Sequence, residues 1–302
     1  MIHPNFKEYL PSYYFSTINP HAAYPKLEGR LKTETCVIGG GLTGLCTALP
    51  LAENGREVTV LEAARIGFGA SGRSGGQVIS DYACGMEEIE KQVGLEQARL
   101  FWQQSLQAVE LVDERVKKHQ IACDWQRGYA TVAIRPQHWE ELQQWHEHAR
   151  QHYGATHYQL WDKATLKQQL ASDMYLGAQF DPHSGHLHPL NYTLGIARAA
   201  AEAGAQIFEQ SPMTRIEPYQ GGWLVHTPDG SIECQNLVYA VNTYAGLHQK
   251  FKPLEKKAIA VSTFIIATEP LGERTKELIR NNMAVCDNRH VLDYYRLSAD
   301  GR

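Results

Sequence analysis

The sequence lacks the cysteine pairs that mark zinc sites and disulfide-rich scaffolds. It contains six cysteines, and no two of them stand in a C-x-x-C arrangement. Structural zinc sites and small secreted scaffolds usually carry closely spaced cysteines. This absence disfavours both classes and indicates a reducing compartment, so we expect a cytoplasmic protein without a metal site.

Long apolar runs and blocks of one charge are also missing. The first 30 residues contain no apolar core of a signal peptide. Glycines interrupt the apolar stretch 37–52, which suits a buried strand and helix better than a membrane span. The 29 Lys and Arg residues nearly balance the 33 Asp and Glu residues, giving a net charge of −4. We therefore expect neither nucleic acid nor stable membrane insertion among the interactions of this chain.

The elements that are present indicate an α/β protein. The chain has 302 residues, 43% of them hydrophobic, which is enough for a large core and two lobes. From residue 34, the strand "TCVIG", the helix "LTGLCTALPLAENG" and the strand "REVTVLEA" predict a βαβ unit with parallel strands. Pro50 lies inside this helix, where it removes a hydrogen bond and should kink the last turn.

Further helices and strands follow along the chain. Residues 86–120 predict one or two amphipathic helices, and residues 214–244 predict a β-meander. The stretch "AVSTFIIATEP" (260–270) predicts another strand. The last residues, "HVLDYYRLSADGR" (290–302), predict a strand that ends in a hairpin turn signal. Because no partner strand follows it, we expect a sheet that is incomplete at this point.

A glycine motif joins the first predicted strand to its helix. Gly39, Gly41 and Gly44 have the spacing G-x-G-x-x-G. The first glycine permits a tight turn, the second lets the backbone approach a pyrophosphate, and the third lets the helix pack closely on the strand. The positive end of the helix then points at the phosphates. Glu62 ends the second strand, where a carboxylate accepts hydrogen bonds from a ribose hydroxyl, so the segment predicts dinucleotide binding.

The next segment carries a family resemblance. "LEAARIGFGASGRSGGQ" resembles the signature of the D-amino-acid-oxidase-like family of FAD-dependent amine oxidoreductases. The resemblance implies FAD as the cofactor and a Rossmann-like FAD-binding lobe with an interleaved α+β substrate lobe. In this family a Gly/Ser-rich loop follows the ribose-binding carboxylate and runs alongside the flavin. Backbone amides of such a loop can stabilise the negative charge of a reduced flavin.

Roles for individual residues follow from the resemblance. Glu62 would bind the adenosine ribose, the segment after Ser211, with Met213 on its strand, would approach the adenine, and residues 72–77 would pass close to the isoalloxazine ring. Arg65, Ala70 and Ser71 would line the pyrophosphate and ribityl region, with Ala240 and Asn242 near the cofactor. The full set of candidate FAD-binding residues is Gly39, Gly41, Leu42, Thr43, Gly44, Glu62, Ala63, Arg65, Ala70, Ser71, Gly72, Arg73, Ser74, Gly75, Gly76, Gln77, Met213, Ala240 and Asn242.

The resemblance also divides the chain. We expect an N-terminal arm at 1–30, the two parts of the FAD-binding lobe at 31–85 and 186–250, and substrate-lobe residues at 86–185 and 251–302. The similarity extends to "SYYFSTINP", "GHLHPLN" and "VLDYYRLSAD". It departs at Pro50 and in the missing C-terminal part of the family, which contains a further flavin contact and completes the substrate lobe. Whether this chain is active therefore stays open.

The implied reaction is oxidation of the CH–NH bond of an amine to an aldehyde through an imine. The implied substrate is γ-glutamylputrescine or a related polyamine-pathway amine, with dioxygen or another electron acceptor. The flavin carries this chemistry, so no catalytic base is assigned. The alternatives are an amino-acid, sarcosine or glycine oxidase, an NAD-dependent dehydrogenase, and a truncated flavin-binding fragment without activity.

Candidate substrate-pocket residues are few. Strand alternation places Tyr294 and Arg296 on one face of the last strand and Tyr295 on the other. Arg296 could pair with a substrate carboxylate, and the tyrosines could form a wall for an amine. Tyr244 and His188 are weaker candidates, and an ordinary half-buried strand is an equally good interpretation of residues 293–296. His183, His186 and His188 share a loop with only Asp181 as an acidic neighbour, so we expect no metal there.

Overall fold

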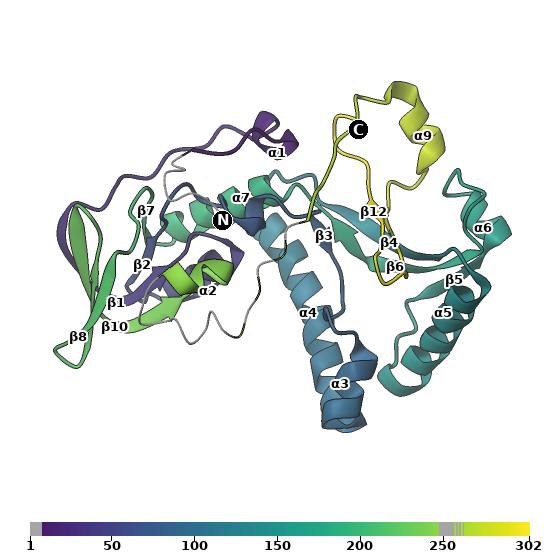
Figure 1. Ribbon diagram of the computed structural model, residues 1–302, viewed down its shortest axis with the longest axis horizontal. Helices are drawn as coiled ribbons and strands as arrows, with labels where there is room; N and C mark the ends of the chain where they lie inside the picture. The colour runs from purple at the N-terminus through teal and green to yellow at the C-terminus, as the bar shows by residue number, and fades with distance from the viewer. Residues whose placement is uncertain (1–7, 248–256, 258, 260, 262) are drawn as a thin grey trace. The chain divides into compact units, whose positions relative to one another are not determined.

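The chain folds into two compact units, each built around a mixed sheet (Figure 1). The computed structural model describes residues 8–247, 257, 259, 261 and 263–302. Unit 1 comprises the described residues of Met1–Ser74, Ile121–Cys123 and Pro189–Ile265, and unit 2 comprises Gly75–Gln120, Asp124–His188 and Ile266–Arg302. The chain thus passes from one unit to the other near residues 74 and 188, whereas the sequence predicted these boundaries at 85 and 185. The expected change at 250 lies outside the described residues, and the assignment of FAD and substrate to the lobes stays a prediction.

Unit 1 contains a six-stranded sheet with a parallel half and an antiparallel half. Its strands are, in spatial order, β7 (Gln206–Phe208), β2 (Val58–Leu61), β1 (Gly29–Ile38), β10 (Gly230–Tyr239), β9 (Gly222–His226) and β8 (Arg215–Tyr219). Its helical segments are α1 (Tyr13–Ser16), α2 (Leu42–Glu53), η1 (Ala70–Gly72), α7 (Pro189–Glu202) and η3 (Asn242–Leu247). The first four strands of the sheet are mutually parallel, and β10, β9 and β8 form an antiparallel meander.

The sequence predicted this part of the fold correctly. β1, α2 and β2 form the expected βαβ unit with parallel strands. The second half of β1 is buried on both faces, as is usual for a central parallel strand. Helix α2 continues for three residues beyond Pro50, because the proline removes only its own N–H donor while its carbonyl still accepts the Asn54 N–H at 3.1 Å. The core beneath the sheet contains Ile38, Leu61 and Val225.

Unit 2 contains a second six-stranded sheet, flanked by helices. Its strands are, in spatial order, β12 (Tyr294–Tyr295), β11 (Ala284–Asp287), β4 (Gln126–Ala133), β6 (Gly177–His186) and β3 (Gln77–Val78), with β5 (Gln159–Asp162) also paired to β6. Its helices are α3 (Met86–Val93), α4 (Leu95–Lys118), α5 (Pro136–His148), η2 (Ala149–Tyr153), α6 (Lys163–Lys167), η5 (Gly272–Arg274) and α9 (Thr275–Leu278). Trp102 of α4 is 1% exposed and anchors the core between α3, α4 and η2.

Of the two strands predicted near the C-terminus, the first is wrong and the second is shorter than predicted. The described residues of 260–270 form no strand, and Phe264 and Ile266 are 91% and 90% exposed. A strand needs a neighbour for its backbone hydrogen bonds, and no strand pairs with this segment among the described residues. Within 290–302 only Tyr294–Tyr295 pair as β12. No helix in the described part of the chain is both long and apolar enough to cross a membrane.

Candidate cofactor-binding site

The glycine turn after β1 leaves no room for side chains. Gly39 has a φ of +112°, and a Cβ atom there would lie 2.3 Å from the carbonyl oxygen of Ala240. A Cβ atom on Gly44 would lie 1.9 Å from the carbonyl oxygen of Gly39, and one on Gly41 would lie 2.8 Å from Ser71 Oγ. Gly39 and Gly44 are therefore required by the local geometry because a side chain would strike backbone, whereas a side chain on Gly41 would displace Ser71 Oγ, and the turn presents bare backbone.

The N-terminus of α2 begins in this turn. Gly41 is its N-cap residue, so the helix has no side-chain cap of its own, and its first turn contains no acidic residue. The Leu42 N–H donates to Ser71 Oγ at 3.0 Å, which brings the predicted η1 loop onto the helix end. Thr43 is exposed beside it. A helix N-terminus in a turn of glycines is a suitable site for a pyrophosphate, so these residues fit a dinucleotide.

Glu62 lies directly against the glycine turn. Its two carboxylate oxygens accept the Gly40 N–H and the Ala64 N–H, each at 2.8 Å. Burial raises the pKa of Glu62, and these backbone hydrogen bonds partly offset the increase. Each oxygen keeps a free lone pair, so the carboxylate can still accept ribose hydroxyls. The predicted neighbour Ala63 is exposed next to it.

A second carboxylate, which the sequence did not identify, holds the loop after Glu62. Glu209 is 2% exposed. It accepts the Ile66 N–H at 2.7 Å, an Arg65 guanidinium N–H at 3.0 Å and the Tyr24 N–H at 3.2 Å. Arg65 also pairs with Glu8 at 2.7 Å. The structure therefore directs Arg65 to two carboxylates, where the resemblance implied a role beside the pyrophosphate and ribityl groups.

The N-terminal arm is fastened to the same loop. The Tyr9 hydroxyl donates to the Ile66 carbonyl at 2.7 Å, and the Glu209 N–H donates to the Pro25 carbonyl at 3.0 Å. One signal could have found Glu209: it follows β7, the parallel neighbour of β2, and residues that follow adjacent parallel strands meet at one edge of the sheet. The Glu62 N–H indeed donates to the Phe208 carbonyl at 2.8 Å.

The remaining FAD candidates divide between the units. In unit 1, a Cβ atom on Gly72 would lie 2.2 Å from the Gly67 carbonyl oxygen, and Arg73 donates to the Gly69 carbonyl. Ala70 begins η1 and Ser74 is exposed. Gly75, Gly76 and Gln77 belong to unit 2, where Gln77 begins β3.

Three candidates come from the second half of the chain. Ala240 borders Gly39, because its N–H donates to the Ile38 carbonyl at 2.8 Å. Asn242 follows with a φ of +51° and an exposed side chain. Met213 was expected on a strand, but it precedes β8, and its side chain packs against the core of the unit 1 sheet.

The predicted substrate residues on the last strand have other partners. Arg296 donates to the carbonyls of Gly75 at 2.9 Å and Leu187 at 3.0 Å. A Cβ atom placed on Gly75 would lie 2.7 Å from the Tyr294 ring. The Tyr295 hydroxyl lies 2.9 Å from the Tyr175 hydroxyl. Arg296 thus holds the backbone beside Gly75, and its interaction with a substrate carboxylate has no support in this geometry.

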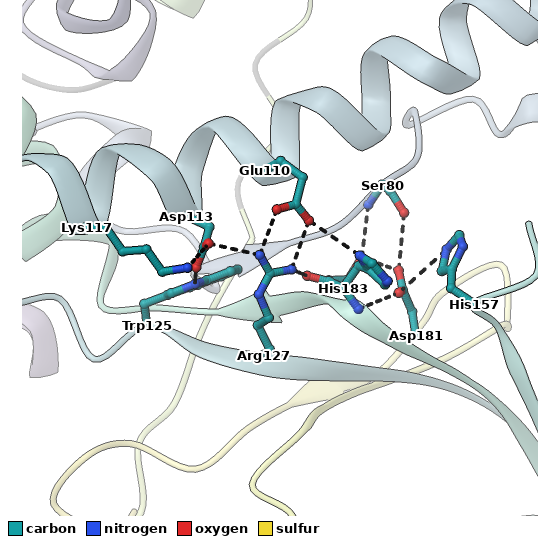
Figure 2. A network of polar contacts seen from close by, with 10 residues as sticks. Ser80, Glu110, Asp113, Lys117, Trp125, Arg127, His157, Asp181 and His183 are labelled. Atoms are coloured by element: carbon teal, nitrogen blue, oxygen red, sulfur yellow. Dashed lines mark hydrogen bonds and ion pairs between the residues drawn. The ribbon is translucent and has the colours of Figure 1, made fainter.

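The other candidates are dispersed. Tyr244 lies in unit 1, with its ring 3.9 Å from a Cβ atom placed on Gly69. His188 is buried, which lowers its pKa. His186 Nε2 donates to the Asn282 carbonyl at 2.8 Å, and burial lowers the pKa of His186 to about 4. His183 lies 3.4 Å from Glu110 (Figure 2). Among the described residues, no group of three His, Cys, Asp or Glu side chains could hold a metal ion.

Comparisons with known proteins agree with this geometry. A family model described as FAD dependent oxidoreductase (DAO) matches residues 34–302. The chain is 45% identical to the probable oxidoreductase OrdL of Haemophilus influenzae over 100% of this chain and 71% of that protein. It is 38% identical to the γ-glutamylputrescine oxidoreductase of Escherichia coli over 98% of this chain and 69% of that protein.

A solved structure shares the fold. The L-amino acid deaminase of Proteus myxofaciens is 24% identical with a TM-score of 0.61, over 75% of this chain and 50% of that chain. The chain therefore spans about half the length of this solved protein. The family match covers the glycine turn, Glu62 and the η1 loop. This chain belongs to the DAO family of FAD-dependent oxidoreductases, and its cofactor is FAD.

Proposed function

We propose that the chain oxidises the CH–NH bond of an amine, γ-glutamylputrescine or a related amine of the polyamine pathway. The observation that carries the proposal is its similarity to the E. coli γ-glutamylputrescine oxidoreductase, at 38% identity over 98% of this chain. The similarity extends through both units, so it is not limited to the cofactor motif.

The chemistry divides between cofactor and protein. FAD, when bound, supplies the two-electron acceptor for the C–H bond beside the amine nitrogen. The substrate carbon becomes an imine, and water hydrolyses the imine to an aldehyde and ammonia or a released amine. Dioxygen or another acceptor takes up the electrons at the end of the cycle. The amine must be neutral to react, and a partly desolvated aromatic pocket favours the neutral form.

The residues of unit 1 bind and orient the cofactor in this proposal. The glycine turn and the N-terminus of α2 hold the pyrophosphate, since they combine bare backbone with the positive end of a helix. Glu62 holds the adenosine ribose with the lone pairs that the Gly40 and Ala64 N–H groups leave free. Glu209 and Arg65 keep the loop that carries Ser71 in place.

In this proposal the residues of unit 2 position the backbone and contribute an aromatic side chain to the amine pocket. Arg296 fixes the backbone at Gly75 and Leu187 rather than contacting substrate. Tyr294, 37% exposed beside Gly75, is the aromatic side chain that we assign to the amine pocket. Tyr295 is a positioning residue through its hydrogen bond with Tyr175. Tyr244 and His188 stay weaker candidates.

A substrate panel tests the proposal. The FAD-loaded chain is offered γ-glutamylputrescine, putrescine, sarcosine and glycine at equal concentrations, and the carbonyl products are quantified by mass spectrometry. We expect a kcat/KM for γ-glutamylputrescine at least about tenfold above those for sarcosine and glycine, which corresponds to about 1.4 kcal/mol in transition-state binding. Faster turnover of glycine or sarcosine would make the chain an amino-acid oxidase. Stoichiometric FAD without turnover of any amine would favour a catalytically silent flavoprotein.

A further inference from the structure

Unit 2 contains a pocket that the proposed function does not use. Its volume is about 650 Å³, and it lies between strands β4 and β6 and helices α3 and α5. Every lining residue belongs to unit 2. None of the candidate FAD-binding or substrate-pocket residues is among them. The proposed function therefore gives no role to the residues that line this pocket.

The floor of the pocket is one face of the sheet. Tyr129 pairs with Asp181 and Thr131 pairs with Gln179 in the β4–β6 register. Side chains alternate along a strand, so these four point to the same face, and all four line the pocket. The residues between them on the same strands belong to a core cluster on the other face, against which Tyr295 packs. The pocket therefore lies on the opposite face of the sheet from Tyr295.

One side chain in the floor indicates that the pocket binds a ligand. Gln179 is 7% exposed, and its Oε1 atom is buried without a hydrogen-bond partner among the residues that the structure describes. Buried polar atoms in folded proteins are nearly always paired, because an unpaired acceptor loses its water without compensation. A donor from a bound molecule would satisfy this oxygen.

The charge of the pocket specifies the kind of donor. Four carboxylates line it, from Asp81, Glu87, Glu88 and Asp181, against the single ammonium group of Lys91. Asp181 is fixed in place by the hydroxyls of two serines and a backbone N–H, as Figure 2 shows in part. Asp181 is buried in the floor, where the low dielectric strengthens its negative potential, and Asp81 and Glu87 add exposed negative charge. A positively charged donor is favoured over a neutral one, and an anion is excluded.

The walls favour an organic cation over an inorganic one. Trp145, Tyr129 and Tyr158 line the pocket together with Met86 and Leu142. Aromatic faces attract ammonium groups, and the apolar side chains suit a short alkyl chain. An inorganic cation would instead need several converging oxygen ligands, and no metal-binding group of three acidic, His or Cys residues occurs in the described chain.

We propose that this pocket binds a small organic cation, a primary ammonium group on a short alkyl chain. The ammonium donates a hydrogen bond to Gln179 Oε1, the carboxylates of Asp81, Glu87, Glu88 and Asp181 balance its charge, and the alkyl chain packs against Trp145 and Met86. None of its residues is among the candidate FAD-binding residues. The proposal does not depend on which amine the chain oxidises.

Isothermal titration calorimetry of the FAD-loaded chain with n-butylammonium tests the proposal. Two further probes separate its parts: n-butanol has the same shape without the charge, and butanoate reverses the charge. We expect saturable binding of n-butylammonium, affinity for n-butanol at least tenfold lower, and no binding of butanoate. Equal binding of n-butanol and n-butylammonium would overturn the proposal, as would the absence of saturable n-butylammonium binding.

Matched variants locate the binding. Gln179→Leu should weaken n-butylammonium binding at least tenfold, and Glu87→Gln, on the surface helix α3, should weaken it about threefold. The controls are Gln107→Leu and Glu96→Gln, both exposed on α4, which should change affinity less than twofold. If Gln179→Leu does not fold, Glu87→Gln still decides. Binding to the amine-oxidation site would survive both pocket variants, so unchanged affinity in Gln179→Leu and Glu87→Gln would overturn the proposal.

Discussion

Glu62 and Glu209 of unit 1 are held in a different way from Asp113 of unit 2. In unit 1, both Glu62 oxygens accept backbone N–H groups, and Glu209 accepts two backbone N–H groups in addition to Arg65. In unit 2, Asp113 accepts only side-chain donors, from Lys117, Trp125 and Arg127 (Figure 2). Glu62 and Glu209 therefore arrange main chain, whereas Asp113 joins side chains of a helix and a strand. The buried Asp181 and Asp287 of unit 2 accept backbone N–H groups as well.

This difference fits the role that we propose for Glu62 and Glu209 beside the cofactor. A pyrophosphate is recognised by oriented main-chain N–H groups, so the loops around it must be held by groups that bind main chain. A side-chain network joins α4 to β4 but leaves the backbone of both to their own hydrogen bonds. Removing Glu209 should consequently cost more than removing Asp113, because two backbone N–H groups lose their acceptor together with one ion pair of Arg65.

The largest expected effect comes from Glu209→Ala. This change leaves the N–H groups of Ile66 and Tyr24 without their acceptor and removes one of the two carboxylates paired with Arg65, which keeps Glu8. We expect a loss of about 2–5 kcal/mol in the free energy of unfolding, because each buried donor left without an acceptor costs about 1–3 kcal/mol. Urea denaturation followed by circular dichroism measures it. Glu209→Gln, which keeps one acceptor oxygen, should lose less. A change below about 1 kcal/mol for Glu209→Ala would contradict the assigned role.

The second effect concerns the glycine turn. Gly41→Asp places a carboxylate beside Ser71 at the N-terminus of α2, where the pyrophosphate would bind. Repulsion between the two anions and the clash with Ser71 should weaken FAD binding at least about tenfold, or about 1.4 kcal/mol. Flavin fluorescence during titration of the flavin-free protein reports this. Thr47→Asp, in the next turn of the same helix, is the control, and equal FAD affinity in the two variants would argue against the site.

The third effect is the pH dependence of unit 2, which appears only below about pH 4. Burial alone would raise the pKa of Asp113, but hydrogen bonds from Lys117, Trp125 and Arg127 outweigh it and lower the pKa to about 2. A depressed folded-state pKa gives stability above the unfolded value near 4, which is lost as the pH falls from 4 to 2. We expect Asp113→Asn to remove about 2 kcal/mol of this pH-dependent stability.

Urea denaturation of the wild type and Asp113→Asn at pH 2, 4 and 7 measures the slope. Glu114→Gln, exposed on the same helix, provides the control and should keep the wild-type slope. Parallel curves for wild type and Asp113→Asn between pH 2 and 4 would show that the side-chain network does not depress the pKa of Asp113.

The cofactor turn could be predicted from the sequence because its parts are local. Strand, glycines, helix and Glu62 follow one another within about 30 residues of chain, the usual span of a βαβ unit, and its handedness is nearly fixed. The close approaches at Gly39 and Gly44 then follow from the spacing of the glycines. Ser71 was found through the family loop, and the structure joins it to Leu42.

Long-range partners could not be predicted in the same way. The alternation of side chains along the strand predicts which face Arg296 occupies. It does not predict that the carbonyls of Gly75 and Leu187 accept hydrogen bonds from Arg296. Glu209 carries no motif, and only the pairing of β7 with β2 brings it to Arg65. The segment 260–270 has a strand-like pattern, but no strand pairs with it among the described residues. Such a pattern does not determine which strand a segment pairs with.

The most direct test of the account is the visible absorption spectrum of the purified chain, before and after γ-glutamylputrescine is added without oxygen. The account predicts a yellow protein with a flavin spectrum that bleaches on addition of the amine and recovers when oxygen or another acceptor is admitted. A yellow protein that keeps its colour with this amine would contradict the proposed substrate. A colourless protein that cannot be reconstituted with FAD would contradict the cofactor site itself.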